Sequence, residues 1–348
     1  MKEHPRVSIV IPVFNEEENI AALAGALSET LVETLTKTLL RAPITEFSAA
    51  GNGRQADGGY ELIFVDDGSE DRSLELLRGL ERDDPRIRYI SFSRNFGHQA
   101  ALRAGMEAAD GDCVVMMDGD FQHPPALLPA MLAEFEKGFD IVATKRLEVK
   151  SGSPGETPYA KRLTSRLFYA LANALSDTKI EPGTADFRLL SRRAKDVILS
   201  MKEHNLFFRG AIPWTGLPST EIAFTPERRK SGKSKYTLSK MFSLALDGIT
   251  SFSVRPLRLT SFAGIAISAA GFLYAIYALL IRLFTDRTVE GWTSILISVL
   301  IIGGIQLLSL GIIGEYLGKL FMETKGRPHY IVKEASPPRG AEASGGRP

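Results

Sequence analysis

Two long stretches near the C-terminal end of the chain carry no charged side chain. No charged residue occurs between Arg258 and Arg282, and none occurs between Glu290 and Glu315. Each stretch exceeds the roughly 20 residues that an α-helix needs to cross the hydrocarbon core of a bilayer. Soluble helices rarely run this far without a polar face. We therefore expect two transmembrane helices, at about 259–281 and 292–314, rather than two buried helices of a soluble protein.

The distribution of positive charge around these stretches predicts their orientation. The flanks carry Arg255, Arg258, Lys319, Lys325 and Arg327, whereas the short loop between the stretches carries Arg282 and Arg287. Positive charge accumulates on the cytoplasmic side of a membrane. The apolar segment that ends at Pro12 is too short for a signal peptide. We expect a multi-pass protein of the inner (cytoplasmic) membrane, with the large N-terminal region and both termini in the cytoplasm.

The chain is long enough, at 348 residues, for one large soluble domain and additional segments. We predict a catalytic domain at 1–235, interface helices at 236–258, the transmembrane hairpin at 259–318 and a tail at 319–348. The interface helices are expected because apolar residues mix with charged ones there, as in helices that lie in the plane of a membrane. The tail after Lys333 is rich in Pro, Gly and Ser, so we expect disorder there.

Charge and cysteine content exclude some classes of function. Lys and Arg total 42 against 41 for Asp and Glu, so no nucleic-acid partner is expected. Cys113 is the one cysteine, which precludes an intramolecular disulfide and fits a reducing compartment. Its apolar neighbours indicate that it packs in the core.

The N-terminal region alternates strand-like and helix-like segments. Strands are expected at Val7–Val13, Tyr60–Val65, Ile87–Phe92, Asp112–Met117 and Ile141–Ala143, and helices at 16–40, 69–80, 97–109 and 124–137. This alternation predicts an α/β domain with a mostly parallel sheet covered on both faces. Residues 49–59 lack an apolar period and are expected to form an exposed, mobile loop, to which we assign no function.

Unusual polar residues follow four of the expected strands. These segments are Asn15-Glu16, Asp66 to Ser69, Ser93 to Asn95 and Asp118 to Asp120. In open parallel sheets, ligands bind beyond the carboxyl ends of the strands. The same residue types also form turns and helix caps, and Asp67 or Ser69 could begin the next helix in that way.

Six motifs follow one another along the chain: IPVFNE at 11–16, VDDGS at 65–69, RNFG at 94–97, DGDFQHPP at 118–125, TADFR at 184–188 and RKSGKSKY at 229–236. In these motifs and their order the sequence resembles family 2 glycosyltransferases. Within them it is similar to the polyisoprenyl-phosphate branch, which contains the bactoprenol glucosyltransferases and dolichyl-phosphate mannose synthases. The resemblance implies a GT-A nucleotide-sugar (Rossmann-like) fold, with interface helices and a C-terminal two-helix transmembrane hairpin.

The resemblance also implies a donor site and a metal site. The expected donor-binding residues are Pro12, Phe14, Glu16, Asp66, Asp67, Arg94 and Asp118. Asp118, Asp120 and Gln122 are expected to hold Mg²⁺ or Mn²⁺, because such cations prefer carboxylate oxygens and substrate phosphates. These three side chains point the same way if the chain stays extended there; the alternative is a turn with Asx hydrogen bonds. His123 is expected to line the loop rather than to bind metal.

On the acceptor side, the resemblance implies roles for Asp186 and for a basic segment. Asp186 matches the residue often proposed as a base, but a phosphate with a second pKa near 6 hardly needs one. We therefore favour an orienting role, through Arg188, and a helix N-cap remains the alternative. Arg229, Ser234 and Lys235 match the family's acceptor loop and are expected to clamp phosphates. A basic patch at the membrane surface is compatible with this role.

The predicted function is therefore transfer of a sugar from a nucleotide sugar to polyisoprenyl phosphate at the membrane, with inversion. Asp120, Asp186, Arg229 and Lys235 are the expected catalytic residues. UDP-glucose is favoured as donor because the hairpin resembles that of the bacterial glucosyltransferases; GDP-mannose is an alternative. A catalytically inactive scaffold that binds nucleotide sugar is a further alternative. The second hydrophobic stretch contains Gly303, Gly304, Gly311 and Gly314. These small residues permit close helix packing and a homo-oligomer.

Overall fold

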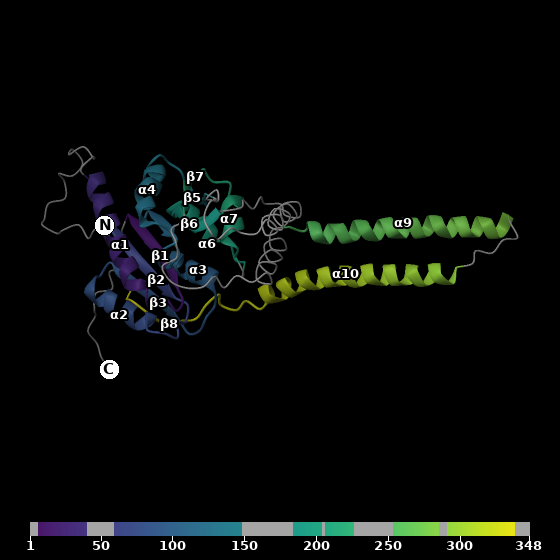
Figure 1. Cartoon of the computed structure of the whole chain (residues 1–348), viewed down its shortest axis with the longest axis horizontal. Coiled ribbons are helices and arrows are strands. Elements are labelled where there is room, and N and C mark those ends of the chain that lie inside the picture. The colour runs from purple at the N-terminus through teal and green to yellow at the C-terminus, as the bar shows by residue number, and fades with distance from the viewer. Residues whose placement is uncertain are drawn as a thin grey trace, which may run out of the picture. The chain divides into compact units, whose positions relative to one another are not determined.

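A computed structural model describes residues 6–39, 59–147, 184–203, 206–225, 253–284 and 291–337. The chain divides into two compact units (Figure 1). The first unit comprises Met1–Glu156, Glu181–Lys235 and Pro328–Pro348, and the second comprises Thr157–Ile180 and Tyr236–Arg327.

The described part of the first unit contains an eight-stranded mixed sheet. Its strands are β1 Val7–Val13, β2 Tyr60–Asp66, β3 Ile87–Phe92, β4 Cys113–Met116, β5 Ile141–Arg146, β6 Thr184–Ser191, β7 Ser219–Phe224 and β8 Val332–Ala335. Their order is β7-β5-β6-β4-β1-β2-β3-β8. The pairs β1–β2, β1–β4, β2–β3 and β5–β7 are parallel, whereas β6 and β8 run antiparallel to their neighbours. The expected α/β class is confirmed.

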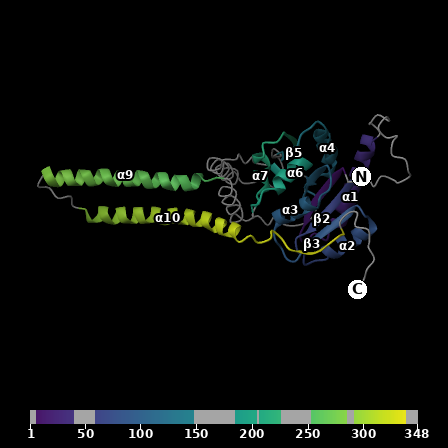
Figure 2. The same cartoon turned by 180° about the vertical axis from the view of Figure 1, so that it is seen from behind.

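Helices cover both faces of this sheet, as the two opposite views show (Figures 1 and 2). They are α1 Ile20–Leu39, α2 Ser73–Asp83, α3 His98–Ala108, α4 Leu128–Glu136, α6 Arg192–Leu199 and α7 Phe208–Trp214. Alternate β1 side chains such as Ile9 and Ile11 join one core with buried residues of α1, α2 and α4. Val10 points to the other face, where α3 approaches so closely that Gly105 has no room for a Cβ.

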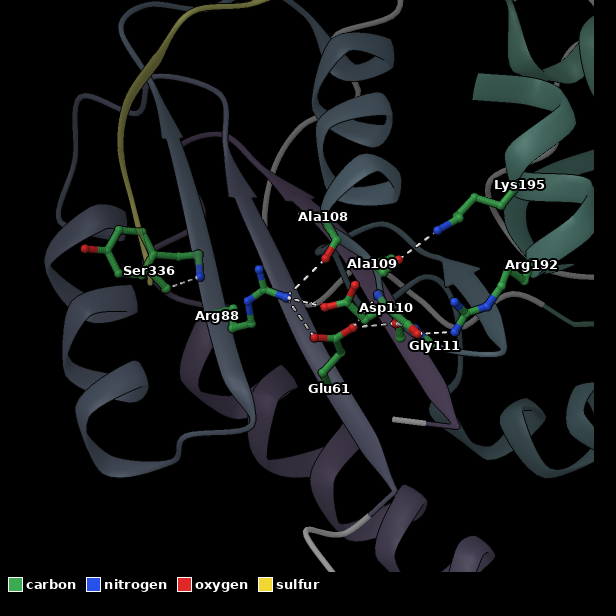
Figure 3. Close-up of polar contacts among 11 residues, drawn as sticks. Glu61, Arg88, Ala108, Ala109, Asp110, Gly111, Arg192, Lys195 and Ser336 are labelled. Carbon is green, nitrogen blue, oxygen red and sulfur yellow. Dashed lines mark hydrogen bonds and ion pairs between the residues drawn. The ribbon is translucent and has the colours of Figure 1, made fainter. Parts of the chain in front are cut away.

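The C-terminal end of α3 is held by three cationic side chains (Figure 3). Each donates to a successive backbone carbonyl: Arg88 to Ala108, Lys195 to Ala109 and Arg192 to Asp110, with donor–acceptor distances of 3.1, 2.8 and 2.5 Å. Cations at this end of a helix are favourable because the helix dipole places partial negative charge there. The contacts fix the position of α3, whose other end lies at the candidate site.

A buried carboxylate supports the same segment. Glu61 is fully buried, and it accepts hydrogen bonds from Ser8 Oγ at 2.6 Å, Asp110 N at 2.9 Å and Arg88 Nη1 at 3.0 Å. A buried charge is tolerated when it is paired and hydrogen-bonded. These contacts therefore connect the beginnings of β1, β2 and β3 to the turn after α3.

All five expected strands are present, with ends that differ by up to three residues. The helix expected from residue 16 begins at Ile20, because Glu16 to Asn19 form a turn in which Asn19 N donates to Glu16 O at 2.9 Å. We did not predict strands β6, β7 and β8. The expectation of disorder immediately after Lys333 is wrong for Glu334 and Ala335, which belong to β8.

Side chains as well as backbone hold β8 at the edge of the sheet. Arg78 donates to both carboxylate oxygens of Glu334 at 2.7 and 2.6 Å. The ring of Tyr330 stacks on Phe92 with centroids 4.8 Å apart. Ser336 Oγ accepts from the backbone N–H of Tyr89 at 2.7 Å. This long-range pairing explains why a Pro-, Gly- and Ser-rich tail can still contribute a strand.

The described part of the second unit contains two long helices, α9 Arg255–Phe284 and α10 Trp292–Thr324. Their segments Arg255–Ile281 and Ile297–Thr324 are long and apolar enough to cross a membrane. The expected spans 259–281 and 292–314 lie within these helices. Most of the predicted interface region, residues 236–252, is outside the described residues, and the domain boundaries remain predictions.

Candidate active site at the carboxyl ends of the strands

The loops that follow β1 and β2 are hydrogen-bonded to each other. Asn15 has a left-handed backbone, with φ of 56°, which asparagine adopts more readily than most residues. Its N–H donates to Ser69 Oγ at 3.0 Å, and its side-chain oxygen accepts from Glu70 N at 2.9 Å. The two strand ends that were expected to converge therefore lie together.

Asp66 and Asp67 both organise these loops. Asp66 is 1% exposed and accepts from Ser69 N at 2.9 Å and Ser91 Oγ at 2.7 Å. Asp67 accepts from the N–H groups of Phe96 and Gly97 at 2.6 and 2.9 Å. Burial raises the pKa of Asp67 despite these donors. Neither carboxylate caps α2, which begins at Ser73; their assignment to the donor remains a prediction.

Gly68 lets the Arg94 loop approach the end of β2. Its φ is 73°, and a Cβ there would lie 2.5 Å from the backbone carbon of Arg94. Arg94 is exposed, and its guanidinium lies 4.1 Å from the centroid of the Phe96 ring. The expected donor-side cation therefore lies on a loop held in place by Asp67 and Gly68.

The expected nucleoside-binding residues after β1 differ in exposure. Pro12 is buried, Glu16 is half-buried and Phe14 is 39% exposed. Glu16 Oε2 accepts from Asn19 Nδ2 at 2.6 Å. An exposed aromatic ring at a strand end can stack on a base, so Phe14 is the residue of this group that the geometry favours for direct contact.

The Asp118–His123 loop does not continue β4. The chain turns at Gly119 and Asp120, and Phe121 adopts a left-handed backbone with φ of 61°. The expected extended path is therefore wrong, and Asp120 Oδ1 accepts from Gln122 N at 3.1 Å in an Asx turn. Even so, Asp118, Asp120 and Gln122 are all partly exposed, whereas the residues between them are buried.

His123 is a structural support for this loop. Its ring is fully buried, stacks on Phe187 with centroids 5.1 Å apart, and accepts the backbone N–H of Asp118 at Nδ1, 3.1 Å away. Burial, together with the nearby charge of Arg146, lowers the pKa of His123 to about 4. The neutral ring therefore supports the backbone at Asp118 from the protein interior.

The donor set at 118–122 fits a hard divalent cation. Two carboxylates and one amide are partly exposed on the same loop, and Mg²⁺ typically uses one or two carboxylates plus substrate phosphates. Burial raises the pKa of Asp118, and the charge of Asp186 adds to this effect. A cation would relieve that cost. Within the described ranges, no group of three or more His, Cys, Asp or Glu side chains could hold a metal by itself.

Asp186 lies within β6, so its alternative role as a helix N-cap is wrong. Arg209 of α7 donates to both of its carboxylate oxygens, Nε to Oδ1 at 2.8 Å and Nη2 to Oδ2 at 2.7 Å. Burial alone would raise the pKa of Asp186, but Arg209 more than offsets it and lowers the pKa to about 2. Asp186 is therefore ionised at neutral pH and is a weak base.

His98 lies close to two carboxylates of the site, those of Asp118 and Asp186. Its Nε2 is 3.5 Å from Asp118 Oδ1 and 3.9 Å from Asp186 Oδ2. His98 is the first residue of α3, directly after Gly97, whose N–H binds Asp67. The loop contacts at one end of α3 and the cations at its other end thus fix this imidazole within the site.

The remaining expected acceptor residues are either buried or not described. The Arg188 side chain is 2% exposed, and burial lowers its pKa to about 10. Its position favours an indirect electrostatic role. Arg229, Ser234 and Lys235 lie outside the described residues.

We did not predict a role for His98 or Arg209 from the sequence. His98 directly follows the RNFG motif, which is a signal that could have identified it. Arg209 lies 23 positions from Asp186, within the unremarkable segment FFRG. Its role depends on how α7 packs, which no local pattern shows.

Two protein-family models match this chain. Residues 8–199 match Glycosyl transferase family 2, and residues 255–320 match the GtrB C-terminal hairpin. The chain is 41% identical over 335 residues to the uncharacterized glycosyltransferase YkcC of Bacillus subtilis (strain 168), covering 96% of this chain and 95% of that protein. It is 34% identical over 330 residues to the SfII prophage-derived bactoprenol glucosyl transferase of Shigella flexneri, covering 95% and 98%.

Proposed function

The chain belongs to glycosyl transferase family 2, and from that premise we propose that it transfers glucose from UDP-glucose to a polyisoprenyl phosphate at the cytoplasmic face of the membrane. The observation that carries the proposal is that Asp118 Oδ1 and Asp186 Oδ2 lie 3.5 and 3.9 Å from the same atom, His98 Nε2. Donor-side and acceptor-side carboxylates are thereby close enough to act on one pair of substrates.

The acceptor is inferred from the relatives and from the hairpin. Similarity to proteins named bactoprenol glucosyl transferase extends over nearly the full length of both chains. The GtrB hairpin match covers α9 and most of α10. Two helices able to cross a membrane suit an enzyme whose acceptor is a lipid. The excess of Lys and Arg on the flanks over that in the connecting loop supports a cytoplasmic catalytic domain.

The reaction forms a bond between an oxygen of the lipid phosphate and the anomeric carbon of the sugar. The bond from that carbon to the donor phosphate breaks, and the nucleoside diphosphate leaves with the bonding electrons. Attack from the opposite side inverts the configuration. The lipid phosphate is mostly ionised at neutral pH, so a carboxylate with a pKa of about 2, such as Asp186, need not remove a proton.

The leaving diphosphate needs positive charge close to it. Asp118, Asp120 and Gln122 would hold Mg²⁺ or Mn²⁺, which supplies Lewis-acid stabilisation of that group when bound. Arg94 is exposed on a neighbouring loop and can add a second positive charge. Phe14 can stack on the base, and Asp66 and Asp67 maintain the loops on which these side chains lie.

A donor panel tests the proposal. Purified full-length protein in detergent is supplied with undecaprenyl phosphate and one labelled donor at a time: UDP-glucose, UDP-galactose, UDP-N-acetylglucosamine or GDP-mannose. We expect a lipid product that carries one hexose, formed fastest from UDP-glucose. Faster transfer from GDP-mannose would contradict the proposed donor but would still support the proposed lipid acceptor. Failure with every donor in the presence of Mg²⁺ and Mn²⁺ would favour an inactive nucleotide-sugar-binding scaffold.

A further inference from the structure

The carboxylate of Asp186 would repel the acceptor phosphate if the two were in direct contact. The carboxylate is ionised because Arg209 pairs with it, and the phosphate carries between about one and a half and two negative charges at neutral pH. Two such groups in contact repel each other. If Asp186 acts on the acceptor, a cationic group must lie between them.

Arg209 has the geometry for that position. Its guanidinium is a planar fork of five N–H donors, and the bidentate pair with Asp186 engages Nε and Nη2. Its side chain is 35% exposed, against 12% for Asp186. Because a bidentate pair fixes the plane of the fork, Asp186 determines the direction in which the rest of the guanidinium points.

The backbone of Arg209 is also well anchored. Its neighbour Phe208 is 2% exposed, and the Phe208 N–H donates to Gln99 Oε1 of α3 at 3.3 Å. Gln99 follows His98, whose Nε2 lies 3.9 Å from Asp186 Oδ2. Contacts from α3 and β6 therefore determine where α7 holds this arginine.

Arg188, the cation expected from sequence, is in a different environment. It lies two residues from Asp186 in β6, but its side chain is 2% exposed. The Arg209 side chain, at 35% exposed, is therefore more accessible to a phosphate from solvent than that of Arg188.

We propose that Arg209 binds the phosphate of the acceptor, and that Asp186 is a positioning residue that acts through Arg209. The inference rests on the proposed acceptor class and specifies the residue that contacts it. It predicts that the two residues function as one unit, so that loss of either mainly weakens acceptor binding.

The test measures binding of farnesyl phosphate, a short soluble probe, to full-length protein in detergent, with farnesol as the phosphate-free comparison. We expect Arg209→Ala to weaken farnesyl phosphate binding about tenfold or more and to leave farnesol binding unchanged. Asp186→Asn should weaken farnesyl phosphate binding less than Arg209→Ala does. In the Arg209→Ala background, Asp186→Asn should have little further effect on this binding. Arg193→Ala is the matched control, because its side chain is 70% exposed on α6.

Arg209→Lys shows whether the planar fork matters. It keeps the positive charge but not the bidentate geometry, so we expect intermediate binding, with UDP affinity at the wild-type level as evidence of correct folding. Wild-type farnesyl phosphate binding by both Arg209 variants would overturn the inference. So would an Asp186→Asn variant with reduced kcat, unchanged acceptor KM and an undiminished effect in the Arg209→Ala background.

Failure of the inference and failure of the proposed function give different results. Arg209-dependent binding of farnesyl phosphate, without sugar transfer from any donor, would contradict the proposed function alone. Normal transfer to undecaprenyl phosphate by Arg209→Ala, with an unchanged acceptor KM, would contradict the inference alone.

Discussion

The close contact between α3 and β1 predicts that the effect of Gly105→Ala on stability depends on the side chain at residue 10. An ideal Cβ at Gly105 would lie 2.2 Å from Val10 Cγ1, far inside the roughly 3.5–4.0 Å of an optimal carbon contact. Val10 is fully buried and β-branched, so it has little freedom to move aside. Overpacking of this kind costs about 1–3 kcal/mol, and the size of the overlap indicates the upper end of that range.

Alanine is also the better helix former, by about 1 kcal/mol. We therefore expect Gly105→Ala to destabilise the folded domain by about 2 kcal/mol, which corresponds to a fall in melting temperature of roughly 4–8 °C for a domain of this size. In the Val10→Ala background the two Cγ atoms are absent, and the nearest neighbour is the residue 10 Cβ at 3.2 Å. There, Gly105→Ala should be neutral or stabilising.

The assay is thermal unfolding of the four detergent-solubilised full-length proteins: wild type, each single variant and the double variant. Val10→Ala alone should be destabilising, because it removes buried methyl groups. If Gly105→Ala lowers the melting temperature equally in both backgrounds, the close approach of α3 to β1 is wrong. The position that we assign to His98 would then lose its support.

Three further predictions concern the site. Asp120→Ala should reduce metal-dependent turnover about a hundredfold or more, measured as label in lipid, whereas Asp83→Ala at the exposed end of α2 should not. Lys235→Ala should raise the acceptor KM about tenfold and leave the donor KM unchanged. The pKa of Asp186 is lowered from 3.8 to about 2, so its contribution to stability is present above pH 4 and lost as the pH falls toward 2. In Asp186→Asn, the free energy of unfolding, measured by denaturant unfolding at a series of pH values, should therefore change less between pH 4 and pH 2 than in the wild type.

Much of the central sheet could be predicted because its strands are short apolar runs bounded by turn residues. Val7–Val13 and Ile87–Phe92 have the expected bounds. The edge strands were harder to predict. β7 alternates exposed and half-buried residues without a strong apolar run, and β8 is a strand because of its pairing with β3.

The site could be located from sequence because parallel strands bring their carboxyl ends to one edge of the sheet. Its internal contacts could not be predicted. Asp67 accepts hydrogen bonds from the backbone N–H groups of Phe96 and Gly97, about 30 residues further along the chain. Asp186 pairs with Arg209, which lies on a different element, α7. Such pairings arise from tertiary packing, which local residue patterns do not encode.

Transfer of labelled glucose from UDP-glucose to undecaprenyl phosphate by the purified full-length chain, with and without EDTA, tests the proposed metal-dependent reaction most directly. We expect labelled lipid without EDTA, loss of product with EDTA, and recovery when excess Mn²⁺ or Mg²⁺ is added. Full transfer in the presence of the chelator would contradict the role assigned to Asp118 and Asp120.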